Sequence, residues 1–181
     1  MINKTNIYHA ALLLTIALGL VVFIYGQQKP QTTNGQLSQK SMDEMNERGD
    51  KAMGFDHTKT THHFLLAEDG GSIQVEANDP KDKESRDQIR MHFRHITMMF
   101  SDGQFDIPML VHAQTPPGAE VMKRLKAEIT YTFKVTERGG MILISTKNSE
   151  ALRAIHDFLR FQIKEHMTGD PLDVSTASKT R

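Results

Sequence analysis

The chain contains no cysteine and no tryptophan among its 181 residues. Without cysteine it cannot form disulfides, thiolate metal sites or a cysteine nucleophile, and lipid cannot be attached through that side chain. It also lacks an excess of either charge, because 22 basic residues balance 22 acidic ones. Nucleic-acid-binding proteins normally carry a basic stripe, and no such stripe is present, so we expect no nucleic-acid partner.

The first 26 residues contain a long apolar run, AALLLTIALGLVVFIY, over residues 10–25. Its length approaches the roughly 20 residues that cross a bilayer. Lys4 precedes it, which predicts a cytoplasmic N-terminus and export of the rest of the chain. An uncleaved anchor would hold the protein in the cytoplasmic membrane with its C-terminal domain in the periplasm. Cleavage after Gly26 would instead release it into the periplasm, but Ile24 is a poor residue for such a site, which favours the anchor.

The remainder divides into three parts by composition. Residues 27–52 form a polar linker with almost nothing to bury, although residues 41–53 could form a short helix that opens with a capping box of Ser41 and Glu44. Residues 53–170 have the length of one ordinary domain. Residues 171–181 are expected to be a disordered tail.

An internal repeat lies within the domain. Two segments share an alternating stretch, a charged turn, a Gly-Gly pair and a second apolar stretch, which together predict a β-hairpin. The matched positions, all separated by the same interval, are Thr61/Thr130, Phe64/Phe133, Glu68/Glu137, Gly70/Gly139, Gly71/Gly140 and Ile73/Ile142.

A helix is predicted after each hairpin, over residues 84–100 and 149–166. Both segments place apolar residues at intervals of three and four along one face. Asn148 or Ser149 suits the N-cap of the second helix. The aligned pairs in the two helices are Ile89/Ile155 and Arg94/Arg160.

We therefore predict an α+β fold built from two ββα repeats, about 60–100 and 129–167. They would form a four-stranded antiparallel sheet with both helices on one face, preceded by the N-terminal transmembrane or signal helix. The connection over residues 101–117 contains three prolines and is expected to be irregular. A short helix is predicted to follow it over residues 118–126.

Histidine and methionine are abundant, with nine and eleven residues. In an exported chain without cysteine, these side chains would suit copper, zinc or a haem iron as cofactor. No standard metal-binding spacing occurs. His92 and His95 could share a helix face with Met91 or Met99 as ligands. Alternatively, the histidines border the apolar stripe and the methionines fill gaps at the helix end.

A second candidate cluster is long-range. Strand alternation turns His62 toward the helices and His63 toward the other face of the sheet. His166 continues the apolar stripe of the second helix and His156 lies beside it, so either could approach His62. The alternative is an ordinary buried histidine that bonds a backbone carbonyl or a carboxylate. His112 is the candidate in the irregular connection.

The predicted metal ligands are therefore of two kinds. The long-range set is His62, His112, His156 and His166. His92 and His95 form the additional pair.

A resemblance is carried by five segments, MGFDHTKTTHHF, GGSIQVEANDPKD, SRDQIRMHF, TPPGAEVMKRLKAEITY and AIHDFLRFQIKEHMTGDPL. Over residues 53–171 the chain is similar to a family of short, exported or membrane-anchored bacterial proteins of undefined function. Some similar sequences carry an aspartate carbamoyltransferase label. The phosphate loop of that two-domain enzyme is a Ser-Thr-Arg-Thr type motif at a helix start. The nearest string here, residues 175–181, is a polar terminal tail, so the residues do not support the label.

Three functions from different classes remain open. The first is a membrane-tethered periplasmic domain that binds a transition metal or haem through histidines. The second is an interaction module whose free sheet face, marked by His63, docks a second copy of the chain or an envelope protein. The third is a hydrolase or transferase with a histidine base. No nucleophile accompanies the histidines, so we predict no catalytic residue and expect binding rather than catalysis.

Overall fold

The computed structural model describes residues 33–174. The predicted anchor or signal segment and the last part of the predicted tail therefore lie outside the described residues. The chain divides into two compact units, Met1–Ser41 and Met42–Arg181. Within residues 33–174, no helix combines the length and the apolar character needed to cross a membrane.

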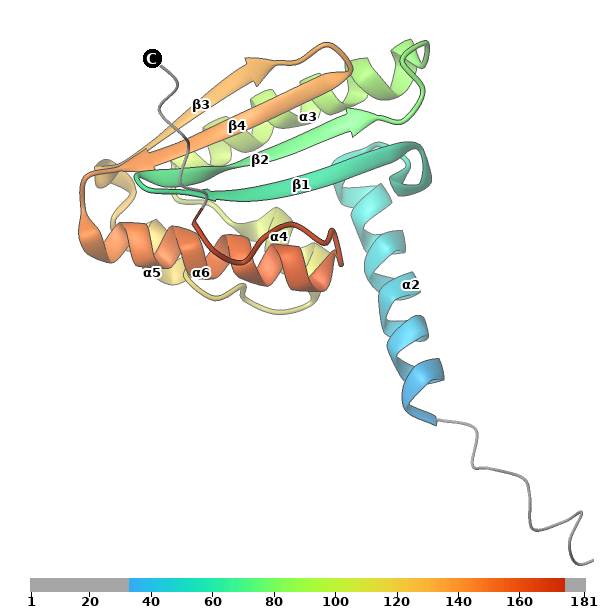
Figure 1. Ribbon diagram of the computed structural model, residues 1–181, viewed down its shortest axis with the longest axis horizontal. Helices are drawn as coiled ribbons and strands as arrows, with labels where there is room; N and C mark the ends of the chain where they lie inside the picture. Colours follow the sequence, from blue (N-terminus) through green and yellow to red (C-terminus); the bar gives the residue numbers. More distant parts are fainter. Residues whose placement is uncertain (1–32, 175–181) are drawn as a thin grey trace, which may run out of the picture. The chain divides into compact units, whose positions relative to one another are not determined.

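Four strands form one antiparallel sheet in the order β1-β2-β4-β3 (Figure 1). In the central row of the sheet, Phe64 pairs with Ile73, Ile73 with Ile142, and Ile142 with Phe133. The predicted α+β class and the four-stranded antiparallel sheet are thus confirmed. The strands are β1 (Thr60–Ala67), β2 (Gly70–Ala77), β3 (Ile129–Val135) and β4 (Gly139–Thr146).

Two long helices pack on the sheet. Helix α3 (Lys83–Ser101) lies mainly against β4 and β3, and α6 (Ser149–Glu165) lies mainly against β1 and β2. Asp82 caps α3 by accepting a hydrogen bond from the Ser85 amide, and Asn148 caps α6 through the amides of the first turn. Such caps satisfy amide groups that have no partner inside the helix. The bounds of both helices nearly coincide with the predicted ones.

Burial alternates along the strands as the sequence predicts. Phe64 and Leu66 are 3% and 2% exposed on the side that α3 and α6 cover, whereas Leu65 between them is 39% exposed. Gly71 follows the same alternation, and a Cβ there would collide with the Leu159 side chain of α6. The hydrophobic core therefore fills the space between one sheet face and the two helices.

The connection between α3 and β3 is more ordered than expected. It contains α4 (Asp106–His112), a helix that the sequence analysis did not predict. Pro108 lies in the first turn of α4, where a missing amide hydrogen costs nothing because that hydrogen would have no partner in the helix. Helix α5 (Ala119–Arg124) and the 3-10 turn η2 (Lys126–Glu128) occupy the region of the predicted short helix.

Helix α2 (Thr33–Met53) begins earlier than the helix that we expected at residue 41. Residues 36–40 are mostly good helix formers, which explains a helix within a polar segment. Its C-terminal part belongs to the folded unit, since Met45 is 5% exposed and Arg48 Nε donates to the Val111 carbonyl over 3.0 Å. The 3-10 turn η1 (His57–Lys59) then leads into β1.

The segment after α6 also packs against the domain. Arg160 Nε donates to the Leu172 carbonyl over 2.9 Å, and Val174 lies against the core. Residues 171–174 therefore have defined contacts, although we expected the tail to begin at residue 171.

Candidate ligand-binding site

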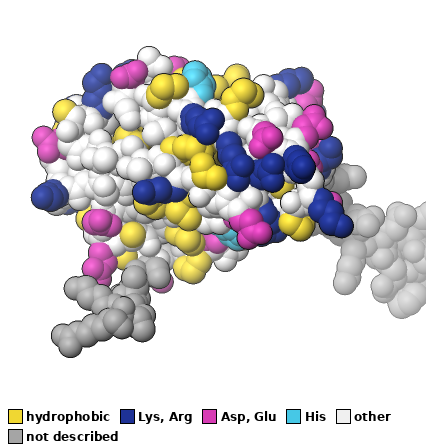
Figure 2. Space-filling model, turned by 90° about the horizontal axis from the view of Figure 1, so that it is seen from above, with side chains coloured by type: hydrophobic (Ala, Val, Ile, Leu, Met, Phe, Trp, Pro, Cys, Tyr) yellow, Lys and Arg dark blue, Asp and Glu magenta, His cyan; other side chains and the backbone are white. Residues whose placement is uncertain are grey.

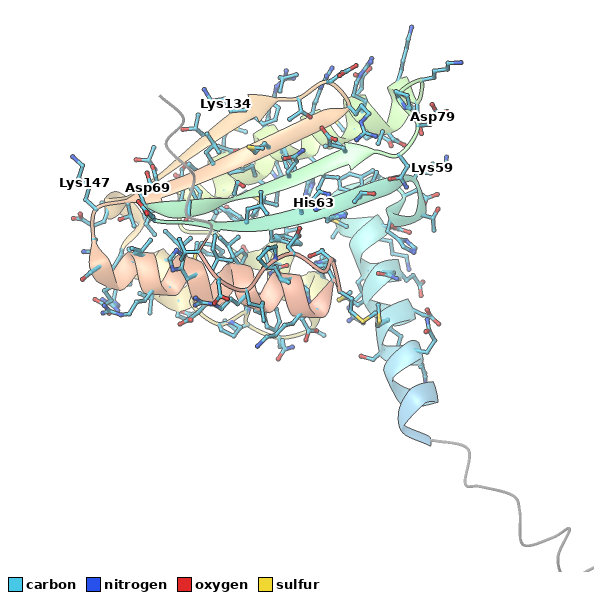
Figure 3. All side chains as sticks on the ribbon, viewed as in Figure 1. Lys59, His63, Asp69, Asp79, Lys134 and Lys147 are labelled. Atoms are coloured by element: carbon cyan, nitrogen blue, oxygen red, sulfur yellow. The ribbon has the colours of Figure 1, made fainter. Side chains whose placement is uncertain are left out.

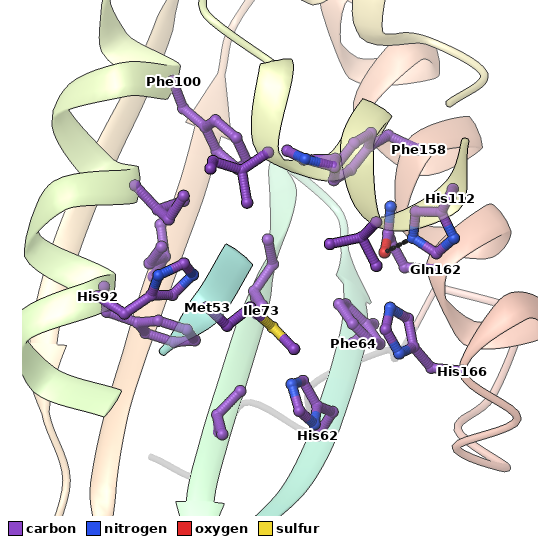
Figure 4. Close-up of a pocket in the computed structure, with 17 residues that line it drawn as sticks. Met53, His62, Phe64, Ile73, His92, Phe100, His112, Phe158, Gln162 and His166 are labelled. Carbon is purple, nitrogen blue, oxygen red and sulfur yellow. Dashed lines mark hydrogen bonds between the residues drawn. The ribbon is translucent and has the colours of Figure 1, made fainter. Parts of the chain in front are cut away.

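An apolar pocket lies between the sheet, α3, α4 and α6 (Figure 4). We call it the histidine pocket, because His62, His92, His112 and His166 all line it. These histidines come from β1, α3, α4 and the end of α6. The fold thus gathers around one cavity four of the six histidines that the sequence suggested as ligands.

His62 enters the pocket because strand alternation turns it toward the helices. Its ring lies 5.5 Å from the His166 ring and nearly parallel to it, at 10°. Phe55 and Phe64 flank the same ring at 5.9 and 6.3 Å. The Nε2 atom of His62 is buried and has no hydrogen-bond partner among the described residues. Its capacity to form a hydrogen bond is therefore unused.

His166 lies at the end of α6, where its amide donates to the Gln162 carbonyl. Its ring is 5.1 Å from the His112 ring and almost perpendicular to it, at 86°. His166 therefore joins His62 and His112 into one series of ring contacts. Of the two histidines predicted to approach His62, it is His166 that does so.

His112 and Gln162 form a buried polar pair. His112 Nε2 lies 3.0 Å from Gln162 Oε1, and the two residues are 7% and 4% exposed. His112 Nδ1 and Gln162 Nε2 remain without a hydrogen bond in the described structure. Glu165 is 3.9 Å from His112 Nδ1, too far for a hydrogen bond. The pair thus offers two more unpaired polar atoms.

His92 approaches from the opposite side, on α3. Its ring contacts the edge of the Phe55 ring at a centroid distance of 5.6 Å. The α3 stripe beside it, which includes Phe93 and Ile96, supplies much of the apolar wall. His92 therefore shares the cavity with the other three histidines although it is distant from them in sequence.

Burial keeps these imidazoles uncharged. It lowers the pKa of His62 and of His92 from 6.5 to about 4, and that of His166 to about 3. The pKa of His112 is lowered as well, mainly by burial, although Gln162 and Glu165 partly oppose the shift. A neutral imidazole keeps one nitrogen lone pair and one N–H. Near neutral pH, the pocket therefore offers both donors and acceptors but no positive charge.

The other predicted histidines lie elsewhere. His156 Nε2 bonds the carbonyls of Ala67 and Gly70 over 2.9 and 3.1 Å, so it ties α6 to the β1–β2 turn. His95 is exposed on α3 and points away from the pocket that His92 lines. His92 and His95 therefore do not share one cavity. His112 belongs to a helix rather than to the loop that we predicted.

Several pocket residues were not singled out in the sequence. Gln162 on α6 is one of them, and Met53 appeared only as the end of the helix predicted over residues 41–53. A glutamine at a core position of an amphipathic helix is itself a signal, because buried amides need partners. Met53 carried no such signal, because its place in the pocket depends on how α2 packs.

The histidine pocket does not form a compact metal-ligand set. Among residues 33–174, one group of three His or carboxylate donors has ligand atoms within 4.8 Å of one another, namely Asp50, Asp56 and His57. Internal hydrogen bonds explain that group. The Asp50 carboxylate accepts from the His57 amide and contacts its ring nitrogen at 2.9 Å, while Asp56 accepts from Thr58.

The free face of the sheet carries a mixed surface. His63 lies on β1 (Figure 3), and Leu65 and Leu143 are both 39% exposed, separated in the register by Ser72. In the view from above, hydrophobic side chains occur in separate groups between Lys and Arg side chains (Figure 2). The histidine pocket is lined by named residues from several elements and is the better-defined candidate site.

Comparisons with protein-family models, with curated proteins and with solved structures found no match for this chain. The site is therefore interpreted from its own geometry.

Proposed function

We propose that the domain binds a small, uncharged and largely apolar molecule in the histidine pocket. The observation that carries this proposal is that two side chains lining an apolar cavity have a buried polar atom without a partner among the described residues: His62 Nε2 and Gln162 Nε2. A buried polar atom without a partner costs about 1–3 kcal/mol. A ligand that pairs these atoms would offset that cost, and this gives the ligand both affinity and orientation.

The lining of the pocket supports a small organic ligand. No Lys, Arg, Asp or Glu is among its described lining residues, and the four imidazoles are neutral. Burying a charged ligand there would leave that charge unpaired, which is costly. The ligand is therefore uncharged.

The internal repeat offers an account of how the pocket arose. In the alignment that pairs Arg94 with Arg160, three pairs of equivalent positions on α3 and α6 line the cavity: His92/Phe158, Ile96/Gln162 and Phe100/His166. We propose that the two ββα units arose by duplication. The two units then diverged, so that two of these three pairs have the polar residue at the α6 position and one has it on α3.

Binding of a neutral fluorescent probe, N-phenylnaphthylamine, to the full chain tests the proposal. The probe should bind with increased fluorescence, and Ile107→Phe should weaken binding about tenfold, since Ile107 lines the pocket and a larger ring would fill it. Leu110→Phe is the matched control, because Leu110 lies on the same helix, is 56% exposed and does not line the pocket. Equal binding by both variants would contradict the proposal.

A transition metal or haem bound through the histidines is the second candidate. It is supported by four neutral imidazoles around one cavity, since neutral imidazole is the form that ligates metals. Copper, zinc or haem added to the full chain should then raise its unfolding temperature. Replacement of His62 and His166 together by Phe should abolish that rise. No thermal shift with any of the three would exclude this candidate.

We also propose that residues 10–25 tether the domain to the cytoplasmic membrane and place it in the periplasm. The uncharged apolar run and the preceding Lys4 support this location. Protease added to spheroplasts should then cleave the domain while cytoplasmic proteins stay intact. Protection of the domain until the spheroplasts are lysed would contradict this location.

A further inference from the structure

A second, polar pocket adjoins the histidine pocket. It lies where α2, the start of β1 and the end of α6 meet. We call it the vestibule. Its walls include the Asn46 amide and the hydroxyl-bearing residues Thr60, Thr61 and Thr168. The vestibule thus offers hydrogen-bonding groups beside an apolar cavity.

Three residues line both pockets, namely Met53, His62 and His166. Figure 4 shows Met53 reaching into the middle of the histidine pocket, between His92 on one side and His62 and His166 on the other. The methionine side chain is unbranched and adapts easily to neighbours. Met53 therefore lies at the boundary between the vestibule and the inner pocket, together with His62 and His166.

Neither pocket is lined by a Lys, Arg, Asp or Glu side chain among the described residues. His57 is the remaining titratable group in the vestibule wall, and its ring already contacts the Asp50 carboxylate at 2.9 Å. A charged head group in the vestibule would therefore find no free opposite charge. The three threonine hydroxyls already donate to groups outside the vestibule, so they offer acceptor oxygens to a ligand. The Asn46 amide offers both a donor and an acceptor, so a hydroxyl or amide group of the ligand would find partners.

We propose that the ligand is an uncharged single-chain amphiphile. Its alkyl or acyl chain occupies the histidine pocket, and its hydroxyl- or amide-bearing head lies in the vestibule. The unpaired nitrogen of His62 lies at the junction, where it bonds the polar atom that links head and chain. This inference rests on the proposed function, because it assumes that the histidine pocket binds a ligand, and it adds the chemical class of that ligand.

Three probes with the same chain length distinguish the possibilities: decanol, monodecanoylglycerol and decanoate. Each competes with N-phenylnaphthylamine for the full chain in lipid nanodiscs, with empty nanodiscs as the blank for partitioning. Monodecanoylglycerol should bind about five- to tenfold more tightly than decanol, as expected for one or two additional hydrogen bonds. Decanoate should bind more weakly than either at neutral pH.

Two variants assign the two ends of the ligand. Asn46→Leu removes a polar group from the vestibule, so it should weaken monodecanoylglycerol and leave decanol unchanged. Ile107→Phe fills the inner pocket, so it should weaken both probes. If N-phenylnaphthylamine itself does not bind, the proposed function fails. If it binds but neither decanol nor monodecanoylglycerol displaces it, the pocket stands and this inference is overturned. If decanol and monodecanoylglycerol bind equally in the wild type and in Asn46→Leu, or if decanoate binds most tightly, the pocket stands but this inference is overturned.

Discussion

At the scale of single residues, Asp170 has an unusual concentration of contacts. Its carboxylate accepts from the Phe64 amide over 2.9 Å and from the Thr168 hydroxyl over 2.6 Å, and it lies 2.9 Å from His63 Nδ1. Partial burial raises the pKa of Asp170, but the hydrogen bonds from Thr168, Phe64 and His63 outweigh it and lower the pKa overall. Because β1 is an edge strand, the carboxylate also satisfies an amide that pairing within the sheet leaves free.

Asp170→Asn should therefore destabilise the protein by about 1–3 kcal/mol, since hydrogen bonds to a charged group are stronger than neutral ones. The measurement is urea unfolding of the full chain near neutral pH. Asp173→Asn provides the matched control, because Asp173 is exposed in the same segment. If Asp173→Asn lost as much stability as Asp170→Asn, the loss of a negative charge, and not the loss of the contacts of Asp170, would be responsible.

At the scale of helices and strands, much of the fold follows from local patterns. The α6 helix was predictable because Asn148 provides a cap and because Ile155, Leu159 and Ile163 recur on one face, all of them buried. The β1–β2 hairpin was predictable because alternation and a Gly-Gly pair both indicate it. Helix α4 was not, because Pro108 was interpreted as a mark of irregular structure although a first turn tolerates it.

The site was only partly predictable. Strand alternation placed His62 on the helix-covered face, and helical spacing placed His166 on the core stripe, so their proximity could be anticipated. Helical spacing did not show whether His156 or His166 lies near His62, because that depends on how α6 lies across β1. The contribution of His92 depends on how α3 packs across the sheet, which its own sequence does not specify. Sequence patterns give the face of an element but not the distance between elements.

The close packing of α5 against α6 requires a glycine at the N-cap of α5. Gly118 has φ 83°, and a Cβ there would collide with the Ala154 carbonyl of α6. Gly118→Ala should therefore cost several kcal/mol, about 1–2 of them from the left-handed backbone conformation. Gly54→Ala is the control, because Gly54 has φ 76° but nothing within 4 Å of the added methyl. Thermal unfolding should show a much larger loss for Gly118→Ala, and equal losses would indicate that backbone conformation alone matters.

At the scale of the whole molecule, the buried histidines link stability to pH. The unfolded chain binds protons on these residues below about pH 6.5, whereas the folded pKa of His62 is about 4 and that of His166 about 3. Between these values the unfolded state binds more protons, so the free energy of unfolding falls as the pH falls. For His62 alone, the loss is on the order of 2 kcal/mol at about pH 5. A domain with such a pocket should therefore be acid-labile.

His62→Phe should reduce this acid lability. Phenylalanine fits among Phe55 and Phe64, has no nitrogen to leave unpaired and cannot be protonated. The variant should therefore be about 1–2 kcal/mol more stable than the wild type near neutral pH, as expected when a buried polar group without a partner is removed. Urea unfolding at neutral and acidic pH measures both effects. The free energy of unfolding should differ less between the two pH values in the variant than in the wild type.

His95→Phe is the control for that comparison, because His95 lies on the exposed face of α3 and its loss should leave the pH dependence unchanged. If His62→Phe kept the full acid lability, the burial of His62 would not be its source. If the variant were more stable but lost affinity for the fluorescent probe, the unpaired nitrogen would be retained for binding at the expense of stability. Such a trade-off is common at binding sites, and it would distinguish a ligand pocket from an imperfection in the packing of the core.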